Sequence, residues 1–330
     1  MMTRERPAGA RQTTSATTSR SEAFVVAHRD EAVRLGTSLA DAIQDPDAFA
    51  ALLGSGLARL GDPEVVEGQH RVAPGLGPTY GVRTPLLDEI RRAFRQATRD
   101  DRPTTLLYVV DRLFREPRLE ARWFAFGLLG RTLPVEPERS WQLLRRAARE
   151  AGEWITVDTL ARSYAAGILA ESYRWAELEQ LVYSPSRWER RLVGSTIATI
   201  PFEDRVAGRL PEVADRALAI LATLIGDHEP DVQKALSWAY RSVLVVDAGA
   251  VTAAMRTETA IAADTDDGHR AWVIRDTLGK LDPAVGAELR TALDGIRRRP
   301  GAPSTSQASE LATRFGGLPD PAAHPEPPLG

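Results

Sequence analysis

A large aromatic ring and a carboxylate lie four positions apart in the segment Trp154-Ile-Thr-Val-Asp158. On a helix these two side chains share one face, one turn apart. Two later segments, Arg187–Arg191 around Trp188 and Gln233–Arg241 around Trp238, again place an aromatic ring beside cations at helical spacing. A carboxylate among tryptophans and arginines can hold a cationic, planar group against a polyanionic backbone. These three segments are therefore the candidate site.

The elements that must position these residues are predicted to be helices throughout the chain. Ala, Leu and Arg dominate the composition, and these residues lose little conformational freedom in a helix. The best candidate strand, Leu106–Val110, has helical flanks that argue against it. Apolar residues recur at helical spacing over Glu22–Leu60, Leu86–Ala97, Thr104–Arg115, Glu120–Leu129, Pro137–Ala151, Thr156–Tyr173, Ala176–Tyr183, Trp188–Ile200, Val206–Ile225, Asp231–Val245, Ala248–Ala262, Gly268–Leu278 and Pro283–Ile296.

Many short helices with tight links are typical of stacked antiparallel helix pairs. Trp154 and Trp188 lie 34 positions apart, as do Trp238 and Trp272, which is within the period of helical-repeat solenoids. We expect one solenoid domain over residues 22–298. The polar arm 1–21 and the Pro-, Ser- and Gly-rich tail 299–330 are predicted to be disordered.

Composition narrows the class of protein. The chain has 330 residues, no cysteine and five scattered histidines, so we expect no disulfide, no metal and no cofactor. No apolar run spans a bilayer and no signal peptide is visible, which favours a cytoplasmic location without a membrane partner. A net charge of −3 is unfavourable for phosphate binding, but arginine pairs such as Arg145-Arg146 and Arg190-Arg191 lie apart from acidic clusters. A basic face with an acidic back is therefore expected.

The chain resembles the HEAT-like-repeat alkylpurine DNA glycosylases, the DNA alkylation repair family of the AlkD type. The segment Tyr80-Gly-Val-Arg-Thr-Pro85 resembles the family's "FGVR-x-P" start of a helix, and Leu119–Ala125 resembles its "E-x-R-x-x-A" helix. The three segments of the candidate site follow in the family's order. The resemblance covers about residues 80–245.

This resemblance implies a C-shaped, right-handed all-α solenoid whose concave groove holds duplex DNA. It implies hydrolysis of the N-glycosidic bond of cationic N3- or N7-alkylated purines, as in base excision repair, by a monomeric, nucleoid-associated protein without base flipping. Trp154, Asp158 and Trp238 match the family's two lesion-facing tryptophans and its catalytic carboxylate. Arg191 matches its backbone-contacting arginine. Glu153 departs from the aromatic residue that relatives often carry there, which leaves the substrate preference open.

Each candidate residue also has a structural alternative. Asp158 could cap a helix that starts near Val157, and the tryptophans could serve only in packing. Lys234, Trp238 and Arg241 fall on one helical stripe, and a stripe with two cations is rarely a core stripe.

Most of the remaining cations and tryptophans are assigned structural roles. Arg190 and Arg191 point about 100° apart on a helix, so at most one of them faces the DNA groove squarely. We assign Trp123, Trp141, Trp175, Trp188 and Trp272 to packing, and Arg297–Arg299 to a solvated helix end.

Two functions from different classes remain open at the level of sequence. The chain can be a monofunctional glycosylase with Asp158 as its carboxylate. It can instead be a non-catalytic helical-repeat scaffold that binds DNA or protein, because solenoids often serve as binding surfaces. A variant of the first function is a self-resistance glycosylase for bulky natural-product adducts, and no residue distinguishes it from general repair.

Overall fold

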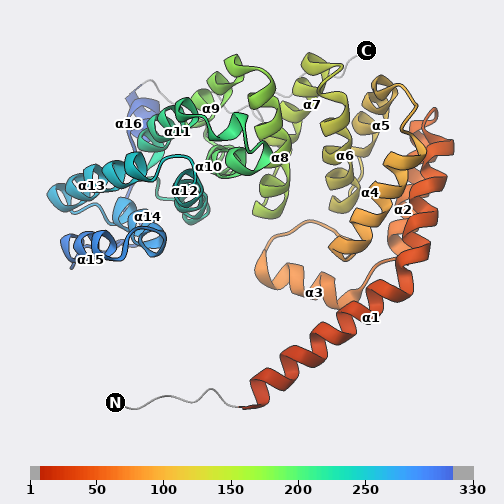
Figure 1. Ribbon diagram of the computed structural model, residues 1–330, viewed down its shortest axis with the longest axis horizontal. Coiled ribbons are helices and arrows are strands. Elements are labelled where there is room, and N and C mark those ends of the chain that lie inside the picture. The colour runs from red at the N-terminus through yellow and green to blue at the C-terminus, as the bar shows by residue number, and fades with distance from the viewer. Residues whose placement is uncertain (1–7, 315–330) are drawn as a thin grey trace. The chain divides into compact units, whose positions relative to one another are not determined.

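The computed structural model describes residues 8–314, and these residues form sixteen α-helices without a β-strand (Figure 1). Only an isolated bridge pairs Gly61 with Val82. The predicted all-α solenoid class is confirmed, and Leu106–Leu113 is helix α5 rather than a strand. Within residues 8–314, no helix combines the length and the apolar character that a membrane crossing requires.

The chain divides into two compact units, Met1–Val135 and Glu136–Gly330, where we predicted one domain. The helices of the first unit are α1 (Ala8–Ser38), α2 (Pro46–Arg59), α3 (Pro63–Val72), α4 (Thr84–Ala97), α5 (Leu106–Leu113) and α6 (Leu119–Thr132). Helix α4 packs against α1, and α2 packs against α5. Phe49, Phe94 and Phe124 bring α2, α4 and α6 together, with ring centroids 5.5 to 6.2 Å apart. These buried rings form the centre of the first core.

A buried carboxylate joins the two N-terminal motifs of the sequence. The fully buried side chain of Glu120 accepts hydrogen bonds from the backbone amides of Tyr80 and Gly81, at 2.9 and 2.7 Å, and a longer one from Val82. Gly81 has a φ of 75°, and a Cβ there would lie 2.5 Å from the carbonyl oxygen of Asp62. The first motif therefore forms a turn whose backbone amides donate to the carboxylate of the second motif.

The second unit contains two layers of helices. Its helices are α7 (Pro137–Glu150), α8 (Trp154–Ala170), α9 (Trp175–Leu181), α10 (Arg187–Glu203), α11 (Pro211–Leu224), α12 (Pro230–Val243), α13 (Ala248–Thr265), α14 (Gly268–Thr277), α15 (Pro283–Ala292) and α16 (Gln307–Arg314). Helices α8, α10, α12 and α14 pack side by side in one row, and α7, α9, α11 and α13 cover one face of that row. The opposite face of the row carries the candidate site.

Helices α10 and α12 approach each other closely in the middle of this row. A Cβ at Gly194 would lie 2.8 Å from the backbone carbon of Ala235, so only glycine allows the observed spacing. Deep burial of both helices follows, with Ile197, Leu236 and Tyr240 at 1% exposure or less. The close contact also brings the N-terminal turn of α12 within reach of side chains on α10.

Both ends of the described chain are more ordered than we predicted. Helix α1 begins at Ala8, inside the predicted disordered arm, and Ser21 accepts a hydrogen bond of 2.6 Å from Arg83. Residues of the predicted tail form helix α16, and the amide of Thr305 donates to the carbonyl of Gly226 at 2.9 Å. Polar contacts rather than apolar bulk hold this segment, and hydrophobic periodicity cannot detect such contacts. Residues 1–7 and 315–330 lie outside the described part of the chain.

We expect Glu120→Gln to destabilise the first unit by about 2 kcal/mol or more. Hydrogen bonds to a charged acceptor are strong, and the NH2 group of a glutamine at this position would face the backbone N–H donors of the turn. Hydrogen exchange of the amides of Tyr80, Gly81 and Val82, together with urea unfolding, measures this effect. Asp100→Asn is the control, since Asp100 forms an exposed pair with Arg99 in the same unit. Equal stability of the two variants would contradict the structural role of Glu120.

Candidate functional site

Asp158 lies in the second turn of α8 and does not cap that helix. The cap is Glu153, whose carboxylate accepts hydrogen bonds from the amides of Ile155 at 2.6 Å and Thr156 at 2.9 Å. Burial raises the pKa of Glu153, and the negative charge of Asp158 raises it further, whereas the hydrogen bonds that Glu153 accepts lower it. The helix thus starts three residues earlier than the capping alternative required. The carboxylate of Asp158 is therefore not used to cap the helix.

Three side-chain hydrogen bonds fix the carboxylate of Asp158. Arg191 on α10 donates from Nε at 3.1 Å and from Nη2 at 2.7 Å, which is the bidentate geometry of a strong ion pair. Ser195, one turn further along α10, donates from its hydroxyl at 2.6 Å. The Asp158 side chain remains 22% exposed, whereas that of Arg191 is 7% exposed. The partners therefore occupy the buried side of the carboxylate and leave an outer edge accessible.

Arg191 connects three helices of the row. Its Nη1 donates to the backbone carbonyl of Asp231 on α12 at 2.7 Å, so α8, α10 and α12 meet at one guanidinium. The guanidinium also lies 5.8 Å from the ring centroid of Trp154. Trp154 is half-buried and sits one turn before Asp158. The structure thus brings together three of the predicted residues, Trp154, Asp158 and Arg191.

The predicted stripe on α12 is present. Lys234 is exposed, and Trp238 and Arg241 are half-buried, while the residues between them face the core. The ammonium group of Lys234 has no ion pair or hydrogen bond with the residues that the structure describes. Trp238 belongs to the uncovered face of the row, as Asp158 does, but on a different helix. One face of the second unit therefore carries a carboxylate, two tryptophans and cations.

Arg190 has a different environment from the one we predicted. Its Nε donates to Asp227 at 2.7 Å, and its Nη1 donates to the carbonyls of Ser184 at 2.8 Å and Pro185 at 3.0 Å. The side chain of Asp227 is fully buried and that of Arg190 is 11% exposed. These contacts tie the start of α10 to the start of α12. Arg190 is thus placed as a structural cation rather than as a free contact for DNA.

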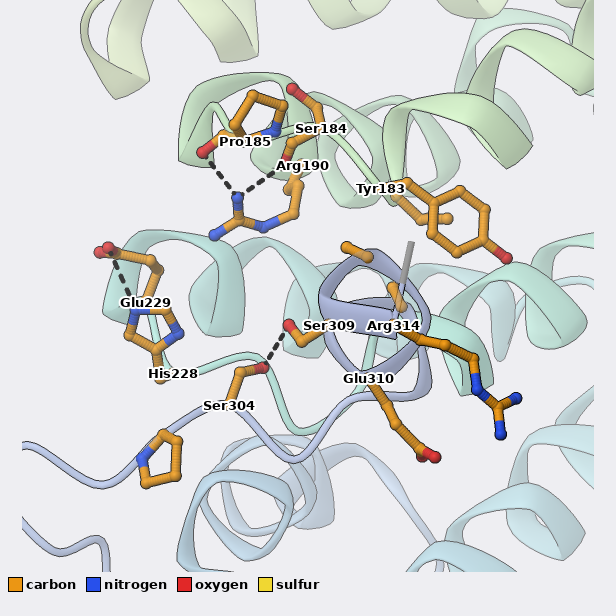
Figure 2. A pocket seen from close by; sticks show the side chains of 14 residues that line it. Tyr183, Ser184, Pro185, Arg190, His228, Glu229, Ser304, Ser309, Glu310 and Arg314 are labelled. Atoms are coloured by element: carbon orange, nitrogen blue, oxygen red, sulfur yellow. Dashed lines mark hydrogen bonds and ion pairs between the residues drawn. The ribbon is translucent and has the colours of Figure 1, made fainter. Parts of the chain in front are cut away.

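A surface hollow of about 1100 Å³ lies beside Arg190 and does not include the candidate site. Figure 2 shows Tyr183, His228, Ser304 and Glu310 among its lining side chains, with the last two contributed by the C-terminal segment. Two hydrogen bonds of Arg190 are visible there. Neither Asp158 nor either candidate tryptophan lines this hollow.

The assignments to packing are mostly confirmed. Trp123, Trp141 and Trp175 are buried, and the ring of Trp141 packs 4.7 Å from that of Tyr164. Trp188 and Trp272 are only half-buried, and each lies beneath a guanidinium, from Arg187 at 4.6 Å and Arg298 at 4.9 Å. The prediction that Trp188 lies in the core is wrong, because an arginine and not an apolar side chain covers its ring. Trp272 packs against a guanidinium in the same way.

Ser195 is part of the site and was not predicted from the sequence. A helical offset of four from Arg191 is the signal that could have found it, since both side chains then meet the same acceptor. Among residues 8–314, no group of three or more acidic or histidine side chains could hold a metal ion.

A comparison with models of protein families finds a match. The model of a family described as DNA alkylation repair enzyme matches residues 53–278, more than two thirds of the chain. The matched range includes α8, α10, α12 and α14, and hence every residue of the candidate site. A search of curated proteins finds no match.

We expect Arg190→Ala to lower the free energy of unfolding by about 3–5 kcal/mol, because it leaves the buried carboxylate of Asp227 without its cation. Arg256→Ala is the matched control, since Arg256 forms an exposed pair with Glu288 that contributes at most about 1 kcal/mol. Urea unfolding measures both changes. A fully stable Arg190→Ala variant with weakened DNA binding would instead support the role that we predicted from the sequence.

Proposed function

Because this chain belongs to the family of DNA alkylation repair enzymes, we propose that it hydrolyses the N-glycosidic bond of cationic N3- or N7-alkylated purines in duplex DNA. The observation that carries the proposal is the carboxylate of Asp158. It is held by three hydrogen bonds on its buried side and is open on its outer edge, beside the half-buried ring of Trp154. A carboxylate fixed in this way suits a reaction in which positive charge develops on a sugar.

The chemistry needs little from the protein beyond charge and orientation. An alkylated purine already carries a positive charge, so it departs as a neutral base and takes the electron pair of the bond from C1′. Positive charge then develops on the deoxyribose, as in an oxocarbenium-like state. Water adds its oxygen to C1′ and releases a proton. Asp158 stabilises the sugar cation and orients that water.

Arg191 gives Asp158 its position and also offsets part of its charge. A carboxylate that was free to rotate would have to reorient during the reaction, and this would add to the activation free energy. The bidentate pair with Arg191 holds both oxygens in place and avoids this cost. The cation lies on the buried side, so a sugar on the outer side is closer to the carboxylate than to the guanidinium. The resemblance assigns Arg191 a backbone phosphate contact, but its side chain is 7% exposed and each of its three nitrogens donates to a protein acceptor, so its main proposed role is to position Asp158.

The two tryptophans are proposed to hold the lesion. Trp154 lies one turn from Asp158, and Trp238 is half-buried on α12. An aromatic face attracts a cationic base or sugar by about 0.5–2 kcal/mol. Asp158 and Trp154 are partly exposed side chains, so a damaged nucleotide can reach them without being flipped into a deep pocket.

Binding to DNA is assigned to cations on the same face. Lys234 is exposed and Arg241 is half-buried, and both lie on the stripe that contains Trp238. Phosphate contacts position a protein on duplex DNA and make its affinity depend on salt. A net charge of −3 is compatible with this because a local group of cations, not the total charge, faces the phosphates.

The direct test is incubation of the protein with duplex DNA that contains 7-methylguanine. Free base and an abasic site are the expected products, without strand cleavage. Binding without release of base would favour the non-catalytic scaffold. A parallel duplex with a bulky N7 adduct tests whether the self-resistance activity is the better description.

We expect Asp158→Asn to slow single-turnover release of 7-methylguanine roughly a hundred- to a thousand-fold, since Asn keeps the size but loses the charge that opposes the sugar cation. The affinity for DNA should change little. Asp215→Asn is the control, because it removes the same charge from an exposed residue on α11. If Asp158→Asn and wild type release base equally fast, the chemistry lies elsewhere.

We expect Arg191→Ala to slow base release even when DNA saturates the protein, because Asp158 then loses two of its three hydrogen bonds. A purely phosphate-binding arginine would raise the dissociation constant and leave the saturated rate unchanged. Ser195→Ala removes the third hydrogen bond and should give a smaller decrease in the same rate. Rates from a saturated complex, measured beside DNA affinities, separate the two roles of Arg191.

A further inference from the structure

A second pair of aromatic ring and carboxylate occurs on α14. Trp272 and Asp276 are four residues apart, as Trp154 and Asp158 are, and both lie on the side of the helix that faces away from the core. Trp272 is half-buried, and Asp276 is exposed. Helix α14 belongs to the same row as α8. The uncovered face of the row therefore presents this arrangement twice.

Asp276 has the same two kinds of partner as Asp158. Ser237 on α12 donates to Asp276 Oδ2 at 2.6 Å. Arg241, one turn further along α12, donates from Nη1 to the same carboxylate oxygen and to the backbone carbonyl of Asp276, the latter at 2.9 Å. Partial burial raises the pKa of Asp276, but the hydrogen bonds from Ser237 and Arg241 lower it by more, so the net pKa lies below its ordinary value.

The two arrangements differ in their balance of charge. Asp158 is paired with one buried guanidinium. Asp276 is paired with Arg241, and two further cations belong to the same pair of helices: Lys234 is exposed on α12, and Arg298 lies against Trp272 of α14. The guanidinium of Arg298 lies 4.9 Å from the ring centroid of Trp272 and donates to Gln233 Oε1 at 2.8 Å. A ring already covered by a cation does not accept a second one, so the local field favours an anion.

Arg241 has N–H donors that no described residue accepts. Only Nη1 is engaged with the residues that the structure describes, and the side chain is 26% exposed. The contacts of Nη1 fix the plane of the guanidinium and leave Nε and Nη2 available. Two parallel N–H groups on one side of a fixed guanidinium match two oxygens of a phosphate.

We propose that α12 and α14 form a second centre, in which Asp276 and Ser237 position Arg241 to bind a backbone phosphate of duplex DNA, with Arg298 and Lys234 beside it. This proposal rests on the proposed function in taking DNA as the ligand and in assigning Lys234 and Arg241 to its phosphates, and it adds the roles of Asp276, Ser237 and Arg298. The first centre then acts on the lesion, and the second holds the strand. Asp276 is a positioning residue, and Trp272 supports Arg298.

Whether Asp276→Asn raises or lowers the affinity for duplex DNA tests the role of Asp276. Removing an acidic charge near phosphates strengthens DNA binding if the acid does nothing else. If Asp276 positions Arg241, Asp276→Asn weakens binding although the protein becomes more positive. We expect the dissociation constant for an unmodified duplex to rise roughly tenfold, as for loss of one charge-assisted hydrogen-bonded contact. The slope of the logarithm of the affinity against the logarithm of the salt concentration should also become shallower by about one, which corresponds to the loss of one phosphate contact.

Fluorescence anisotropy with an unmodified duplex at several salt concentrations measures these quantities. Glu288→Gln is the matched control, because Glu288 forms an exposed pair with Arg256 between α15 and α13, and its loss should leave binding unchanged or slightly tighter. In an Arg241→Ala background, Asp276→Asn should no longer weaken binding. Tighter binding by Asp276→Asn, or equal weakening with and without Arg241, overturns the proposal.

A measurement on the wild-type protein avoids any effect of substitution on folding. Lys234 is one of two lysines in the chain, so acetylation of its amine can be followed by mass spectrometry of one peptide. Duplex DNA should slow that modification several-fold if the second centre binds the backbone, and an unchanged rate would contradict it. Neither experiment requires base release. A wild-type protein that binds DNA through Arg241 but releases no base would refute the proposed function and leave this inference standing.

Discussion

The ion pair between Arg191 and Asp158 is the interaction on which the second unit depends. It joins α8 to α10 by two hydrogen bonds and, through the carbonyl of Asp231, joins both helices to α12. A buried arginine is costly unless its donors are satisfied, and here all three nitrogens have an acceptor. The same contacts that meet this requirement hold Asp158 in one orientation. Packing and the preorganisation of the site are thus consequences of one side chain.

Several arginines of the second unit have buried, structural roles. Arg190 is tied to buried Asp227, Arg174 stacks on Trp141, and Arg270 lies buried between Glu258 and Asp267. Guanidinium groups can do this because they are planar, remain charged and stack on rings. A count of basic residues therefore overestimates the charge that is available to phosphates. The cations on the uncovered face of α12 matter more than the total of the chain.

The row of α8, α10, α12 and α14 explains how widely separated residues form one surface. One layer of helices covers one side of the row, so polar residues on the other side remain partly exposed. Close contact at Gly194 keeps neighbouring helices near enough for side chains to bond across them. Carboxylates on α8 and α14 each find a serine and an arginine on an adjacent helix in this way. The repeated geometry follows from the repeated packing, with local charge giving each copy a different character.

The sequence by itself determined the helices, their approximate bounds and the four-residue spacing of Trp154 and Asp158. These follow from helical periodicity and from the properties of single residues, which are local. It also indicated the stripe of Lys234, Trp238 and Arg241, because positions three and four apart on a helix share a face. Motifs around Tyr80 and Glu120 were visible, although their mutual contact was not.

Only the tertiary structure decided which charges meet. Arg190 and Arg191 are adjacent in sequence, yet one is tied to Asp227 and the other to Asp158, because a step of one residue on a helix turns the side chain toward a different neighbour. Burial and pairing across helices likewise placed Ser195 in the site and ordered residues near Thr305, where no local pattern indicates structure. The partner of a charged side chain depends on which helix packs beside it, and that is a property of the folded chain.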